Sequence, residues 1–98
     1  MNLESLIKGK KIVLLDFYAT WCGPCMSMMP ILDQLKTTIE VDLDIVKIDV
    51  DKNLDFAVSQ KVMGVPTFAL YVDGIERWRA AGTYSASELS SIIRQFQL

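Results

Sequence analysis

A nearly unbroken apolar stretch over residues 11–19 constrains the fold of this chain more than any other feature. Its apolar members are contiguous rather than alternating, and they are Ile12, Val13, Leu14, Leu15, Phe17 and Tyr18. A strand with apolar residues on both sides needs cover on both faces, which is typical of the middle of a parallel sheet. The stretch therefore predicts a buried central strand with helices above and below it.

Helical spacing dominates the segment that follows. One apolar stripe is formed by Cys25, Met28, Met29, Leu32, Leu35 and Ile39. Pro30 falls inside this predicted helix and is expected to kink it, because proline lacks the amide donor and crowds the preceding turn. Residues 43–50 predict a second strand. A strand, a helix and a strand of these lengths imply a right-handed parallel crossover.

Capping signals predict the two short helices. Asn2 is expected to cap a first helix over residues 3–8, which Gly9 would end. Asn53 is expected to cap a third helix over residues 54–61. Its buried side would hold Phe56, Ala57 and Val58.

A hairpin and a last helix complete the predicted order. Asp73-Gly74 is a strong two-residue turn signal between strands at residues 67–72 and 75–81. Ser85 with Glu88 three residues later forms a capping box that opens the last helix. The order of elements predicts an α/β protein with a small mixed sheet and helices on both faces.

The length and the net charge of the chain limit the classes of function that it can have. The chain has 98 residues, 51% of them apolar, which is enough for one domain with its own core over residues 1–98. A net charge of -2 offers no basic surface for nucleic acid or for membrane lipid. The longest apolar run, residues 12–15, is far too short to span a bilayer. The first residues do not match a secretory signal peptide, so the expected location is the cytoplasm.

The segment Trp21-Cys22-Gly23-Pro24-Cys25 holds both cysteines of a chain that has no histidine. It joins the predicted central strand to the predicted helix, so Cys22 would lie at a helix start, where free amides and the helix dipole favour a thiolate. Pro24 suits the first helical turn, and Gly23 leaves room for a substrate chain. Cys25 lies one turn on, within disulfide reach, and would be the more buried thiol. The pair predicts a reversible dithiol switch; a static disulfide and half of a metal site shared by two chains are the alternatives.

Several motifs in this order resemble the thioredoxin family from about residue 11 to the C-terminus. They are Asp16 to Cys25, Pro30 to Asp33, Gly64 to Thr67, Asp73-Gly74 and Gly82. The resemblance implies a thioredoxin fold, an α/β fold with a central mixed sheet of four or five strands flanked by helices on both faces. We expect four strands, because the first residues are too few for the strand that typically precedes the first helix. Met26 stands where many members carry lysine, so a positive charge is missing beside the thiols.

Asp16 is the second candidate for chemistry. Burial among apolar neighbours would raise the pKa of its carboxyl group, and such a group can take a proton from Cys25 through water. The resemblance implies this role. It also matches Lys47 to the family's lysine that pairs with this acid. The positive charge of Lys47 would partly oppose the rise in the pKa of Asp16. The alternative for Asp16 is an acid on a solvent-facing strand surface, and the alternative for Lys47 is an exposed strand lysine.

The resemblance also implies a peptide-binding rim. The Val65–Pro66 bond would be cis, and the backbone of Val65 would face an extended client peptide. With Gly23 and Pro24 of the cysteine segment, a shallow apolar collar would consist of Trp21, Met63, Gly64, Ala81 and Gly82. A packing role is the alternative for Trp21. Of the three methionines Met26, Met28 and Met29, the first is expected beside the site and the others in the core.

Together these residues predict a protein dithiol–disulfide oxidoreductase that reduces disulfides of client proteins. By resemblance it would be a monomer with no bound cofactor or metal beyond the Cys22–Cys25 disulfide. An NADPH-dependent flavoprotein, thioredoxin reductase, would recycle it. The alternatives are a dedicated or exported thiol reductase with one partner, a docking subunit whose thiols are idle, and a metal or cluster bridged between two chains.

Overall fold

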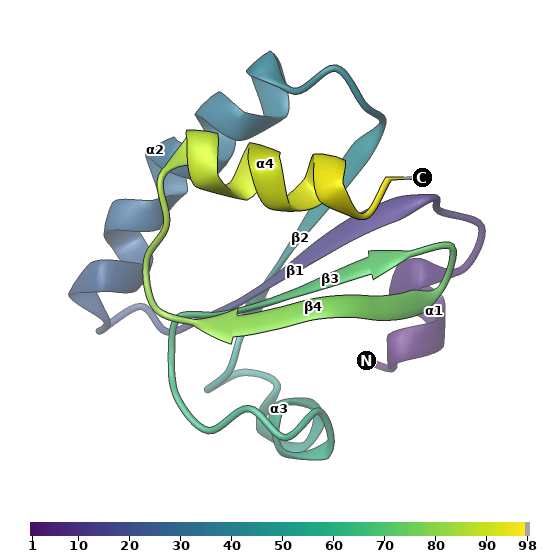
Figure 1. The fold of residues 1–98 in the computed structure, drawn as a ribbon. Coiled ribbons are helices and arrows are strands. Elements are labelled where there is room, and N and C mark those ends of the chain that lie inside the picture. Colours follow the sequence, from purple (N-terminus) through teal and green to yellow (C-terminus); the bar gives the residue numbers. More distant parts are fainter. Residues whose placement is uncertain (98) are drawn as a thin grey trace.

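A four-stranded mixed sheet lies between two layers of helices in the computed structural model, which describes residues 1–97 (Figure 1). The elements are α1 (Leu3–Ile7), β1 (Ile12–Tyr18), α2 (Gly23–Thr38), β2 (Leu43–Asp49), α3 (Leu54–Ser59), β3 (Thr67–Val72), β4 (Ile75–Ala81) and α4 (Ala86–Gln95). The strand order is β2-β1-β3-β4. β1 is parallel to β2 and antiparallel to β3, and β3 is antiparallel to β4. α2 and α4 cover one face and α1 and α3 the other, as predicted.

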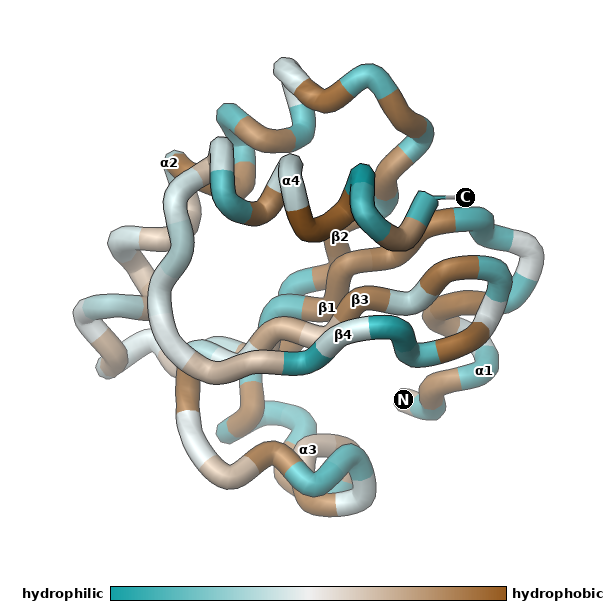
Figure 2. The backbone as a smooth tube through the Cα atoms, in the orientation of Figure 1, coloured by the Kyte–Doolittle hydropathy of each residue, from teal (hydrophilic) through white to brown (hydrophobic). Residues whose placement is uncertain are grey.

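β1 lies in the middle of the sheet, as its contiguous apolar sequence predicted. In the register of the sheet, Leu14 lies opposite Ile45 on one side and Leu70 on the other. Alternation along β1 divides its side chains between the two layers: Leu14 packs beneath α2 and α4, and Leu15 packs toward α1 and α3. Long hydrophobic stretches of backbone run through these central strands in Figure 2.

Helix α2 buries the predicted stripe except at Met29, which was expected in the core. Cys25, Met28, Leu32, Leu35 and Ile39 are buried. Met29 is half-buried, and Met26 lies at the surface. The helix continues past the exposed Pro30 to Thr38.

Local hydrogen bonds confirm several predicted element ends. The Asn2 side chain accepts from the Ser5 amide at 2.9 Å, which caps α1. Asp73 and Gly74, with φ of 51° and 79°, form the hairpin turn. The capping box of α4 has both of its bonds: Ser85 Oγ accepts from the Glu88 amide at 3.0 Å, and Glu88 accepts from the Ser85 amide at 2.9 Å.

The predictions for α3 were partly wrong. Asn53 stands at the N-cap, but its side chain donates to the carbonyl oxygen of Asp49 instead of accepting from a helix amide. The helix ends at Ser59 because Lys61, with φ of 60°, has left the helical region. Val58 is exposed, since Phe56 and Ala57 form the buried face. α1 likewise ends one residue early, at Ile7.

Candidate active site

The two cysteines form a disulfide at the N-terminus of α2. Cys22 is the N-cap residue, and its Sγ accepts from the backbone amide of Cys25 at 3.2 Å. The Cα atoms of the pair lie 5.2 Å apart. Cys25 is fully buried, whereas 6% of Cys22 is exposed, so only Cys22 presents an edge to solvent. The helix amides that are free at this end favour negative charge on Cys22 once the pair is reduced.

The loop before β3 lies directly beside Cys22. Its Val65–Pro66 peptide bond is cis, and the carbonyl oxygen of Val65 lies 3.8 Å from Cys22 Sγ. The loop is held in place from two sides. The Gly82 amide donates to the Pro66 carbonyl oxygen at 2.9 Å, and the Thr67 hydroxyl donates to the Gly64 carbonyl oxygen at 2.6 Å.

Two hollows flank this loop. The larger, about 350 Å³, is lined by Trp21, Val50, Leu54, Ala57, Val58, Val62, Met63, Gly64 and Val65. The smaller, about 180 Å³, is lined by Lys61, Met63, Gly64, Thr67, Arg79, Ala80 and Ala81. The structure therefore brings predicted collar residues from three separate segments to the loop beside Cys22: Trp21, Met63, Gly64 and Ala81 line the hollows, and Gly82 bonds to Pro66. Trp21 and Met63 are 71% and 96% exposed, which excludes a packing role for Trp21.

Sequence reasoning missed the part of the larger hollow that α3 supplies. Leu54 and Val58 are exposed apolar residues four apart, so they lie on one side of α3 and extend the apolar surface beside Trp21. That spacing was the available signal, but Val58 was assigned to the core. Asp51 was missed as well: it accepts a hydrogen bond from Trp21 Nε1 at 2.8 Å and so orients the indole ring. Trp21 and Asp51 are 30 positions apart in the sequence, so no local sequence pattern indicates that they are in contact.

Asp16 is buried beneath α2, as its apolar neighbours indicated. It is 0% exposed, and neither carboxylate oxygen accepts a hydrogen bond within the described residues. Burial raises the pKa of this carboxyl group from 3.8 to about 7, and the positive charge of Lys47 opposes the rise. Lys47 lies opposite Asp16 in the β1–β2 register. The Lys47 side chain is 37% exposed, and its Nζ lies 3.8 Å from Oδ1 of Asp33 on α2.

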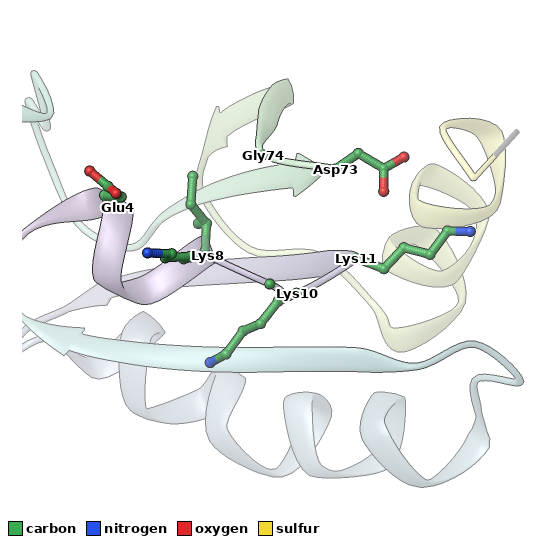
Figure 3. A pocket seen from close by; sticks show the side chains of 8 residues that line it. Glu4, Lys8, Lys10, Lys11, Asp73 and Gly74 are labelled. Atoms are coloured by element: carbon green, nitrogen blue, oxygen red, sulfur yellow. The ribbon is translucent and has the colours of Figure 1, made fainter.

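A third hollow, of about 450 Å³, lies at the opposite end of β1 from the cysteines, around the α1–β1 loop and the hairpin turn. Lys8, Lys10 and Lys11 border it, but their ammonium groups point in different directions (Figure 3). Lys10 pairs with Asp44 at 3.1 Å. This hollow has no convergent set of groups. Elsewhere within residues 1–97, no three His, Cys, Asp or Glu side chains group as metal ligands, and no helix is both long and apolar enough to cross a membrane.

A disulfide at a helix start, a backbone carbonyl group beside its outer sulfur and a buried acid under the helix define a site for thiol–disulfide exchange. The fold and the site are thus those of a thiol–disulfide oxidoreductase. The family model Thioredoxin matches residues 1–95. The chain belongs to the thioredoxin family.

Individual relatives agree with this assignment. Thioredoxin Y1, chloroplastic, of Arabidopsis thaliana is 42% identical over 86 residues, which cover 88% of this chain and half of that protein's length. A thioredoxin-like protein of Synechocystis is 40% identical, covering 97% of this chain and 88% of the relative. Among solved structures, a mutant thioredoxin from Halobacterium salinarum has a TM-score of 0.87 at 34% identity, covering 97% of this chain and 82% of that one. Oxidised mitochondrial thioredoxin 3 of Saccharomyces cerevisiae has a TM-score of 0.84 at 38% identity, covering 95% and 86%.

Proposed function

We propose that this chain is a protein-disulfide reductase. The observation that carries the proposal is the Cys22–Cys25 disulfide at the start of α2, in which Cys22 keeps a small exposed edge, Cys25 has none and the Val65 carbonyl group lies beside Cys22. An extended peptide can bind such a free backbone edge whatever its side chains are, and the adjoining apolar hollow can take a side chain of the client. The working redox group is the disulfide itself.

The first step is attack on the client. In the reduced protein, the Cys22 thiolate attacks one sulfur of a client disulfide, so a Cys22–client bond forms and the client S–S bond breaks. The other client sulfur leaves as a thiolate and takes a proton from water. The helix amides around Cys22 stabilise the attacking thiolate, which raises its reactive fraction at neutral pH.

The second step releases the client. Cys25 passes its proton to the Asp16 carboxylate through water, and its thiolate attacks Cys22 Sγ. The Cys22–Cys25 bond forms, the mixed disulfide breaks and the second client thiolate leaves. The client has gained two electrons and this chain has lost two. A pKa of about 7 keeps part of the Asp16 population ionised, and so able to accept the proton, near neutral pH.

Client proteins with disulfides are the partners that the family indicates. One similar solved structure, covering 95% of this chain at a TM-score of 0.85, is titled for the thiol resolving mechanism of a yeast mitochondrial 1-Cys peroxiredoxin via glutathione and thioredoxin systems. For this chain we propose clients of that general kind, an NADPH-dependent thioredoxin reductase as electron donor, and a monomeric working state.

Reduction of insulin disulfides, driven by NADPH and thioredoxin reductase, tests the proposal. The wild-type protein should reduce insulin, and Cys22→Ser should not, because it lacks the attacking sulfur. Cys25→Ser is the matched variant: it should also fail to turn over but should accumulate a mixed disulfide with the client, since it keeps Cys22. A wild-type rate no higher than that of Cys22→Ser would overturn the assignment. Turnover with dithiothreitol but not with the reductase would identify a dedicated reductase with a different donor.

A further inference from the structure

The surface ion pair between α2 and β2 lies on the same face of the sheet as the buried acid. Lys47 follows Leu43 and Ile45 at alternate positions of β2, and Ile45 packs in the core beneath α2 and α4. Asp16 follows Ile12 and Leu14 on the same face of β1, directly opposite Lys47. The ammonium group of Lys47 contacts the exposed carboxylate of Asp33, and its positive charge acts from a greater distance on the buried, unpartnered carboxyl group of Asp16.

We propose that Asp33 is a positioning residue for proton transfer: it holds the Lys47 ammonium group outward at the edge of the sheet and so sets the proton affinity of Asp16. The proposal deepens the proposed function, since it concerns the proton acceptor for Cys25. The contact on which it rests is the 3.8 Å distance between Lys47 Nζ and Asp33 Oδ1.

The other charges on this face are placed differently. Besides Lys47 and Asp33, the titratable or charged side chains of the elements on this face are Tyr18 on β1, Asp49 on β2, Cys25 and Lys36 on α2, Tyr84 before α4, and Glu88 and Arg94 on α4. Asp49 accepts from the amides of Asp51 and Lys52, and Lys36 donates to the Leu43 carbonyl oxygen. Both cysteines are in the disulfide. The register partner of Asp16 on β3 is Phe68, which carries no charge.

The sign of the effect follows from two contributions that act together. Without the Asp33 charge, the Lys47 ammonium group loses its outer partner and is free to approach Asp16, which favours the ionised carboxylate. Loss of a negative charge on the same face also favours ionisation of Asp16. Both contributions lower the pKa of Asp16 in Asp33→Asn. Replacing Lys47 by Met removes the opposing cation and should raise it.

The test is a titration of Asp16 in the oxidised protein, where the cysteines do not titrate. Carboxyl carbon NMR follows the midpoint, and Asp16→Asn assigns the signal. We expect Asp33→Asn to lower the midpoint by about 0.3 to 0.5 pH unit, since an exposed ion pair is a weak interaction. Asp33→Glu should restore the wild-type value. Asp44→Asn is the matched control: it breaks the other exposed ion pair of β2, with Lys10, and should leave the midpoint unchanged.

A double-mutant cycle shows whether Asp33 acts through Lys47. In the Lys47→Met background, Asp33→Asn should shift the midpoint by clearly less than in the wild type. An unchanged or raised midpoint in Asp33→Asn, or an equal shift in both backgrounds, would overturn the proposal. Because this readout needs no turnover, its failure is separate from failure of the insulin assay, which tests the reductase function itself.

Discussion

Among the single residues, Asp16 is ionised in the folded protein only at an electrostatic cost. A rise of its pKa from 3.8 to about 7 corresponds to about 4 kcal/mol against the ionised form in the folded protein. Below about pH 4 the Asp16 carboxyl group is protonated in both the folded and the unfolded chain, so its ionisation does not change the free energy of unfolding. Between about pH 4 and 7 the folded protein keeps a proton that the unfolded chain has released, so the free energy of unfolding falls as pH rises.

Replacing Asp16 by Asn is expected to remove this loss. At about pH 8 the oxidised variant should have a free energy of unfolding higher than that of the wild type by up to about 4 kcal/mol, and the two proteins should converge toward about pH 4. Guanidinium unfolding across this range measures the difference. Asp44→Asn, which changes an exposed carboxylate, should follow the wild type at every pH. A stability gap for Asp16→Asn that stays constant down to about pH 4 would contradict the assignment of its cause to ionisation.

The same substitution should slow release of the client. Without the acceptor, the Cys25 thiol must give its proton directly to water, so mixed disulfides should persist longer than in the wild type. The catalytic and stability effects of Asp16→Asn therefore have opposite signs. This is the pattern of a group kept for chemistry at a cost to the folded state.

At the scale of single elements, α4 depends on its capping box. Ser85 and Glu88 satisfy two amides that the helix start would otherwise leave without partners. Ser85→Ala should lower the free energy of unfolding by about 1 kcal/mol. Ser87→Ala, two residues on in the same turn and exposed, is the matched control and should be neutral or slightly stabilising. Equal effects from the two substitutions in thermal unfolding would show that the cap contributes nothing.

The sequence predicted this element so well because its signals are local. A capping box, a turn at Asp73-Gly74 and a contiguous apolar strand each depend on residues that are close in the chain. α3 was predicted less well for the same reason. Asn53 has the side chain of a good cap, but the carbonyl oxygen of Asp49 takes its amide group instead. The preceding loop places this competing acceptor beside Asn53, and residue preferences for helix caps do not take such an acceptor into account.

At the scale of the whole molecule, the fold gathers the site at one end of the sheet. β1 delivers the cysteines to the start of α2, and the loop before β3 places Val65 beside them. The cysteine pair and the buried acid could be proposed from their local sequence, and the family resemblance located the collar. The bonds from Trp21 to Asp51 and from Lys47 to Asp33 could not, because they join segments whose relative placement only the packed structure fixes.

Titration of the Cys22 thiol in the reduced protein is the decisive experiment on whether the start of α2 activates this sulfur for exchange. Thiolate absorbance and the pH dependence of alkylation report the ionisation, and Cys22→Ser and Cys25→Ser assign it. The start of α2 should let Cys22 ionise at lower pH than a free cysteine thiol does, with Cys25 ionising later, and mild oxidation should restore the internal disulfide. Ionisation of Cys22 at or above the pH of a free thiol, in a pair that does not cycle, would contradict the account.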